Sequence, residues 1–225
     1  MNQHEGAKET HSVYIPEHFR VRHYEDTIAF MRANPFAILI SSTDEGPYAT
    51  HLPLFVDGSG EKLLLRGHVA RANPHWQYLK QQPQCLTIFH GPHAYISPSN
   101  YTARESVPTW NYAAVHVYGE ARIFSSEPDV HRMLEELMQT FEPAYREQWE
   151  SLRQGFRENM LHGIVGFEIT ATKIEGKFKF SQNRPRQDQA NVMASLEKSA
   201  DSTASGVARM MKDLNLGKIA EKKSE

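Results

Sequence analysis

The sequence has little cysteine and no long apolar run. Cys85 is the only cysteine among 225 residues, and it lies in the apolar run 84–89. One thiol excludes a disulfide framework and a thiolate metal cluster, so we expect a buried, inert side chain. No stretch approaches the ~18 consecutive apolar residues of a membrane-spanning helix, and residues 1–10 lack the apolar segment of a signal peptide. These absences predict a cytoplasmic protein without a membrane partner.

An excess of positive charge is also absent. The chain has 25 lysines and arginines against 27 aspartates and glutamates, a formal net charge of −2. Attraction to nucleic-acid phosphates would therefore need a local patch, and no helix-turn-helix with a basic recognition helix is apparent. The composition weighs against a dedicated DNA-binding protein.

Several nucleotide and catalytic motifs are missing. The chain contains no Gly-x-Gly-x-x-Gly, Walker loop, Gly-x-Ser-x-Gly or His-Glu-x-x-His, so Rossmann, P-loop, hydrolase and zincin interpretations lose their usual support. Among 12 histidines, His90 and His93 are the closest pair, but they flank a Gly-Pro turn and have no carboxylate or thiolate at ligand spacing. We therefore predict loop histidines and no metal site.

Short apolar runs with period-two alternation, separated by Gly, Pro, Asp and Ser turns, indicate an antiparallel meander of six or seven strands. The predicted strands are 36–40, 48–56, 62–66, 84–89, 113–124 and 163–174. The predicted helices are a short one capped by Asp26, a helical stretch at 68–80, one capped by Ser126, one at 144–160, and two within 187–214. Residues 90–108 are predicted to be loop. The pattern predicts a small antiparallel barrel decorated by helices.

One segment combines two arginines, a histidine and an asparagine where a strand is expected to meet a helix. Arg66, His68, Arg71 and Asn73 lie within ten residues of one another. Arginine forks and helix N-terminal amides together suit a phosphate. An exposed basic turn is an equally good interpretation of the spacing alone.

Aromatic and amide side chains gather in two segments that flank the end of the predicted loop. Residues 92–101 and 107–112 offer apolar faces and directed donors, the mixture that a flat heteroaromatic ring requires. The alternative is a Tyr- and Trp-rich loop that covers a barrel end. Residues 181–184 add four donor side chains after a strand, near Lys177 and Lys179, and the alternative there is a solvated strand exit.

Six blocks in order, at 14–19, 50–54, 67–74, 91–98, 107–112 and 181–184, resemble the PaiB family of FMN-binding negative transcriptional regulators. The resemblance extends from about residue 14 to residue 214. Residues 186–192 depart from it, because they lack the acidic and glycine-rich character expected after Ser-Gln-Asn-Arg.

The resemblance implies a mainly β fold with added helices: an antiparallel FMN-binding split β-barrel like that of pyridoxamine-phosphate oxidase. It implies an obligate homodimer with FMN at the subunit interface. The expected organisation is a disordered leader at 1–12, the FMN-binding split-barrel domain at 13–185, C-terminal helices at 186–215 and a flexible tail at 216–225.

The resemblance also implies which residues contact FMN. The phosphate side would be Arg66, His68, Arg71 and Asn73. The remaining candidates would lie along or around the isoalloxazine and close the pocket: Thr50, His51, Leu52, Pro53, Trp110, Asn111, Lys179, Ser181, Gln182, Asn183 and Arg184.

Three functions stay open at this point. The chain is an FMN-binding regulator or redox or ligand sensor, an FMN-dependent oxidoreductase or flavin reductase that uses NAD(P)H, or a flavin-free partner-binding barrel. Direct DNA binding follows from the family name alone.

Overall fold

The computed structural model describes residues 12–124, 126–214 and 216. The predicted leader, except Ser12, and the predicted tail, except Leu216, lie outside the described residues. The strands are β1 Phe36–Thr43, β2 Gly46–Pro53, β3 Phe55–Asp57, β4 Leu64–Ala70, β5 Gln84–Ile96, β6 Thr109–Phe124 and β7 Ile164–Lys179. The helices are η1 Glu17–Phe19, α1 Tyr24–Ala33, α2 His75–Gln81, η2 Pro98–Asn100, α3 Glu127–Phe141, α4 Tyr145–Ser151, α5 Gln154–His162, α6 Arg186–Glu197 and α7 Ser202–Asp213.

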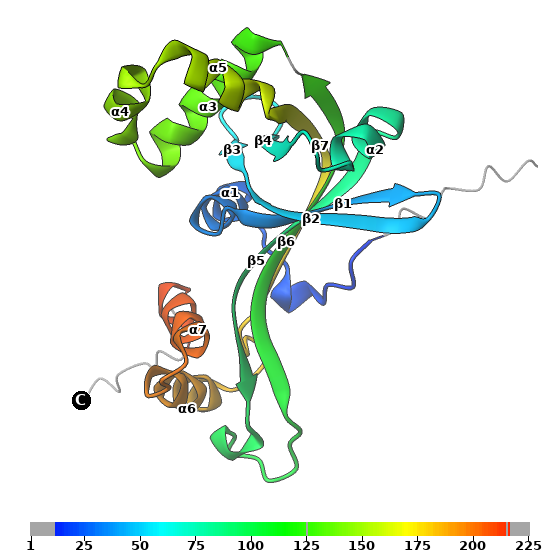
Figure 1. The fold of residues 1–225 in the computed structure, drawn as a ribbon. Helices are drawn as coiled ribbons and strands as arrows, with labels where there is room; N and C mark the ends of the chain where they lie inside the picture. The colour runs from blue at the N-terminus through cyan, green and yellow to red at the C-terminus, as the bar shows by residue number, and fades with distance from the viewer. Residues whose placement is uncertain (1–11, 125, 215, 217–225) are drawn as a thin grey trace, which may run out of the picture.

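The seven strands form one antiparallel sheet in the order β2-β1-β5-β6-β7-β4-β3. Only Leu54 separates β2 from β3, yet these strands lie at opposite edges of the sheet, so the sheet curls on itself into a barrel (Figure 1). Leu54 is buried, and a Cβ on Gly67 of β4 would lie 2.7 Å from its Cδ2. Glycine at position 67 therefore allows the barrel to close tightly around this corner.

The core follows the period of two along the strands. On β4, Leu65 and Val69 point inward, and on β7 Val165, Phe167 and Ile169 do the same. The burial of apolar surface stabilises this interior by about 25 cal/mol for each Å² removed from water. The predicted buried thiol is present: Cys85 is 8% exposed, and burial raises its pKa to about 12.

Strands β5 and β6 continue beyond the barrel as a long two-stranded arm, against which α6 and α7 lie (Figure 1). We define the arm as residues 90–112 together with the chain at 177–185. Helices α3, α4 and α5 are inserted between β6 and β7. Helix α3 packs against β3, β4 and β7, α4 packs on α3, and α5 packs on α3 and β7. No helix within the described ranges is long and apolar enough to cross a membrane.

The arm corrects two predictions. Residues 90–108 were predicted to be loop, but β5 runs to Ile96 and β6 starts at Thr109, so Trp110 and Asn111 are strand residues. The Gly-Pro signal at 91–92 marks a shift of register between His90 and His93 instead of a turn.

The prediction of a helical stretch at 68–80 is also wrong at its start. His68 lies in β4, which pairs with β7 as far as Ala70, and α2 begins only at His75. The predicted strand 48–56 divides at Leu54, so the order is not a simple meander.

Helix boundaries shift elsewhere as well. The predicted helix 144–160 divides into α4 and α5, and the N-cap of α1 is His23, which leaves Asp26 in the first turn. The Ser126 cap is confirmed, since its hydroxyl accepts a hydrogen bond from the Asp129 amide.

Candidate functional site

Two separate groups of polar residues contain seven of the fifteen predicted site residues. The first, here called the barrel cluster, consists of Ser41, Tyr48, Thr50, Asn73 and His75. Asn73 Nδ2 donates to Thr50 Oγ1 at 3.2 Å, and His75 Nδ1 lies 2.8 Å from the same hydroxyl. Tyr48 donates its hydroxyl proton to Asn73 Oδ1 at 3.3 Å, and His75 Nε2 lies 3.0 Å from Ser41 Oγ. The structure thus brings predicted residues Thr50 and Asn73 together from β2 and the start of α2.

The side chains of the barrel cluster form hydrogen bonds with one another within the chain. His75 is fully buried, and burial lowers its pKa to about 4, so the neutral imidazole is the form that the fold accommodates. Sequence analysis did not single out His75 or Tyr48. Their side chains fix the start of α2 and hold Asn73 in place.

Next to the barrel cluster, the outward face of β4 carries a histidine without a partner. His68 Nδ1 is buried and makes no hydrogen bond among the described residues, and burial lowers the His68 pKa. A buried polar atom without a partner is destabilising by about 1–3 kcal/mol, so a ligand that bonds to His68 Nδ1 would relieve that cost.

Arg71 follows β4 and is exposed. Its Nε donates to the His162 carbonyl oxygen at 2.6 Å and its Nη2 to the Ile164 carbonyl oxygen at 3.0 Å. These two bonds orient the guanidinium while leaving its charge without a carboxylate partner in the described part of the chain.

Arg66 is placed differently from the other phosphate candidates. Its guanidinium lies 2.7 Å from Glu168, 3.2 Å from Glu136 and 3.4 Å from Asp57, and its side chain is 18% exposed. A phosphate there would meet three carboxylates, so the structure does not group Arg66 with Arg71 and Asn73. The sequence showed the arginine but not the acids, which come from β3, α3 and β7.

The β2 candidates point in two directions. Leu52 is 4% exposed and belongs to the core, whereas His51 and Pro53 face outward on the same strand. Phe36 of β1 is 60% exposed and stacks with His51 at 6.3 Å between ring centroids. This face of β1 and β2, at an edge of the sheet, presents an uncovered aromatic pair.

The second group, the arm cluster, consists of Asn111, Lys179, Ser181, Gln182 and Arg184. Asn111 is fully buried and its Nδ2 donates to Ser181 Oγ at 3.0 Å. Ser181 has a φ of 64°, a conformation unusual for a residue other than glycine. Gln182 accepts from the Phe180 amide at 2.7 Å and donates to the Phe178 carbonyl at 2.6 Å. These bonds hold the chain turned where β7 ends.

The arm cluster carries positive charge. Burial, Lys177 and Arg184 lower the pKa of Lys179, which contacts the Thr109 hydroxyl. Arg184 lies 4.2 Å from the centroid of the Tyr101 ring. Among the described residues, none of these three cations forms an ion pair with a carboxylate. The charge of the arm cluster therefore favours an anionic or electron-rich group beside it.

Exposed aromatic rings lie on the same arm. Trp110 and Tyr95 are each 53% exposed and meet edge to face at 6.0 Å between centroids. Asn183 is exposed at the turn after β7. Tyr95 was not among the predicted site residues, although period-two burial over 94–96 could have placed it on an exposed face of a strand.

The barrel and arm clusters are far apart within a protomer. Thr50 is in register with Leu39, Thr87 and Val117, whereas Asn111 lies six residues further along β6. At about 3.3 Å per residue that is roughly 20 Å along the strand alone. The two clusters are thus separate groups of polar residues on one chain.

Comparisons with known proteins identify the family of the chain. Residues 13–173 match the family described as "Putative FMN-binding domain". The chain is similar to the protease synthase and sporulation protein PAI 2 of Bacillus subtilis, with 36% identity over 204 residues, 89% of this chain and 97% of that protein.

Solved structures share the fold. The flavocytochrome Anf3 of Azotobacter vinelandii aligns with a TM-score of 0.56 at 16% identity, covering 72% of this chain and 69% of that one. A conserved hypothetical protein of Mycobacterium tuberculosis aligns with a TM-score of 0.55 at 13% identity, covering 76% and 94%. The predicted antiparallel split barrel is confirmed.

Proposed function

Because the chain belongs to the PaiB family of FMN-binding proteins, we propose that it is a homodimeric flavin-dependent regulator. In this proposal the barrel of one protomer and the arm of its partner enclose each FMN. The main support for the proposal is that the predicted residues Thr50 and Asn111 lie roughly 20 Å apart along the strand direction, in two separate polar clusters. A two-fold axis can place the arm of one protomer beside the barrel of the other.

His68 and Arg71, which precede Asn73 of the barrel cluster in the chain, fit the phosphate end of FMN. Arg71 has an exposed, oriented guanidinium, and the His68 ring has a buried nitrogen without a partner. Charge-assisted bonds from arginine to phosphate are among the stronger polar contacts in proteins. We therefore assign the phosphate to Arg71 and His68, with Asn73 fixing the loop, and we leave Arg66 to its carboxylates.

The ring end would be held by the exposed face of β2 and by the partner's arm. His51 and Pro53 present an open edge, and Trp110 offers an aromatic face. FMN supplies reversible hydride and electron transfer. Lys179 and Arg184, held close together by the arm, would favour added negative charge on the ring.

The regulatory role is supported by the Bacillus subtilis relative, whose name refers to protease synthesis and sporulation. Direct contact with DNA is not part of the proposal, because a net charge of −2 provides no general attraction to phosphates.

An absorbance spectrum of the purified protein, combined with light scattering, tests the proposal. We expect flavin bands in the blue and near-UV, release of FMN on heating as identified by mass spectrometry, and twice the mass of one chain. A colourless protein that leaves the fluorescence of added FMN unchanged would leave only the flavin-free alternative.

Stopped-flow mixing with NADPH then separates a sensor from a reductase. A sensor is expected to keep its oxidised flavin spectrum over seconds in excess NADPH. Rapid bleaching with multiple turnovers would instead identify a flavin reductase.

A further inference from the structure

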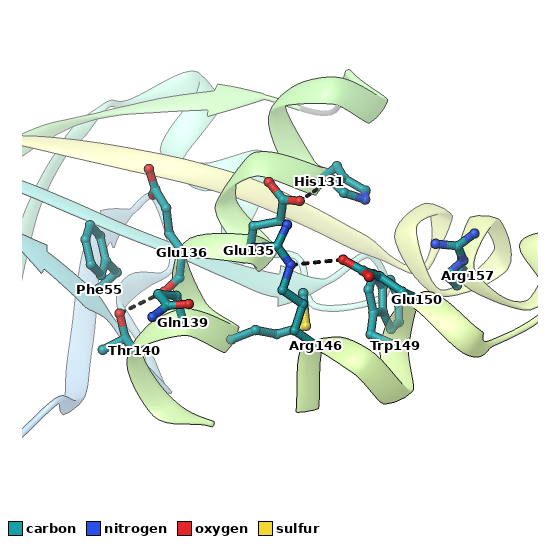
Figure 2. Close-up of a pocket in the computed structure, with 11 residues that line it drawn as sticks. Phe55, His131, Glu135, Glu136, Gln139, Thr140, Arg146, Trp149, Glu150 and Arg157 are labelled. Carbon is teal, nitrogen blue, oxygen red and sulfur yellow. Dashed lines mark hydrogen bonds and ion pairs between the residues drawn. The ribbon is translucent and has the colours of Figure 1, made fainter. Parts of the chain in front are cut away.

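The inserted helices α3, α4 and α5 enclose a cavity that the FMN proposal does not use. Its volume is about 530 Å³, within the range of small-molecule sites. Figure 2 shows Phe55 and Thr140 at one end and Trp149 and Arg157 at the other. None of the residues assigned above to FMN lines this cavity.

The acidic side chains that line the cavity already have partners. Glu136 pairs with Arg66 at 3.2 Å, and Glu150 pairs with Arg146 at 2.9 Å. Glu135 Oε1 lies 3.6 Å from His131 Nδ1. The carboxylates therefore do not call for a cationic ligand.

The unsatisfied polar atoms of the lining are hydrogen-bond donors. Trp149 is 8% exposed and its indole Nε1 has no acceptor, and the buried Nε of Arg157 has none either. Among the described residues, the Arg157 side chain forms neither a hydrogen bond nor an ion pair, although its backbone N–H donates to the Arg153 carbonyl oxygen. Two buried donors without acceptors, one of them cationic, point to a ligand that brings acceptor oxygens.

The rest of the wall is suited to an apolar body. Phe55 and Met138 line the cavity together with the indole ring of Trp149. We propose that the cavity is an effector site for a small aromatic carboxylate, whose oxygens bind the Arg157 guanidinium and the Trp149 N–H. The ring of the ligand would lie against Trp149, Met138 and Phe55. Helix α3 also carries Glu136, which forms an ion pair with Arg66 of β4. The cavity is therefore connected to the barrel through α3.

Isothermal titration calorimetry of the purified protein, with whatever flavin it retains, tests the proposal, with 2-naphthoate as the probe and 2-naphthamide as its uncharged analogue. We expect saturable binding of one naphthoate per chain and weaker binding of the amide. In Arg157→Gln we expect naphthoate affinity to fall about tenfold or more, as loss of a charge-assisted bond predicts, with little change for the amide. Trp149→Phe, which keeps the ring and removes the donor, should cause a smaller loss.

Arg153→Gln is the matched control, because Arg153 is exposed at the start of α5 and does not line the cavity. It should bind naphthoate like the unaltered protein. Equal affinity in Arg157→Gln and the unaltered protein, or no saturable heat with naphthoate, would overturn the proposal. The flavin spectrum of each variant is recorded in parallel, so loss of FMN is distinguished from loss of this site.

Discussion

The barrel cluster and the arm cluster differ in how many of their polar and charged groups have a partner within the chain. In the barrel, Asn73, Thr50 and His75 bond to one another, and His75 is fully buried. On the arm, Trp110 is half exposed and Lys179 lies near two further cations without a carboxylate partner in the described chain.

The two regions therefore differ in how many polar groups they leave open to a ligand or a partner. A saturated, buried network can hold its shape in an isolated protomer. Exposed aromatic rings and uncompensated charge on an extended pair of strands are what interfaces and ligand sites present. The arm thus presents exposed aromatic rings and positive charge, whereas the side chains of the barrel cluster are already paired with one another.

The largest contrast should be in folding stability. Phe167→Ala removes a fully buried ring from the barrel core and should lower the free energy of unfolding by about 3–5 kcal/mol. Urea unfolding followed by circular dichroism, at one fixed protein concentration, measures it. The control is Val107→Ala near the arm tip, where a residue that is 70% exposed should change stability by less than about 0.5 kcal/mol.

The pH dependence of stability should arise chiefly in the barrel. Burial holds the His75 pKa at about 4, below its usual 6.5, so the folded state resists protonation that the unfolded chain accepts. The stabilisation that neutral His75 contributes is fully present above about pH 6.5 and is lost as the pH falls toward 4. We expect the free energy of unfolding to fall by roughly 2.5 kcal/mol between pH 7 and 4.5.

Urea unfolding of His75→Asn at both pH values checks this expectation. We expect the variant to be less stable than the unaltered protein at pH 7. Between pH 7 and 4.5, its free energy of unfolding should fall by roughly 2.5 kcal/mol less than that of the unaltered protein. An unchanged pH dependence would show that His68 or His116, whose pKa values burial also lowers, carries the effect.

The edge of the barrel should discriminate FMN from riboflavin. Arg71→Ala should weaken FMN by about 1.5–3 kcal/mol relative to riboflavin, because only FMN carries the phosphate. Fluorescence titration with both ligands gives the difference. The control is Arg122→Ala, an arginine with a side chain 67% exposed that bonds Glu168. If Arg71→Ala lost equal affinity for FMN and for riboflavin, the assignment of the phosphate to Arg71 would be wrong.

The arm should affect assembly rather than folding. Trp110→Ala removes an exposed ring and should weaken dimerisation by about 2 kcal/mol, since tryptophan is frequent among the residues that dominate interface energy. Sedimentation equilibrium measures the dissociation constant. An unchanged constant would place the dimer interface away from Trp110 and break the contrast between the two regions.

Much of the barrel was predictable from alternation and turn residues. The runs at 36–40, 113–124 and 163–174 all proved to be parts of strands, because buried side chains recur with period two. The predicted loop 90–108 was wrong over residues 90–96, which belong to β5, because Gly91-Pro92 has the local chemistry of a turn. A Cβ at Gly91 would lie 2.7 Å from Phe30, so that glycine instead lets α1 approach the arm.

The sequence by itself determined the curled antiparallel sheet, the inert thiol and the residue types that can hold a flavin, since these follow from local patterns and from recognisable blocks. Tertiary structure alone decided which of those residues are free to act. Arg66 is neutralised by acids that come from as far as 102 positions away, Leu52 is buried, and Asn111 is fixed by Ser181. The physical reason is that charge pairing and burial depend on neighbours in space, which only the closed barrel and its arm bring together.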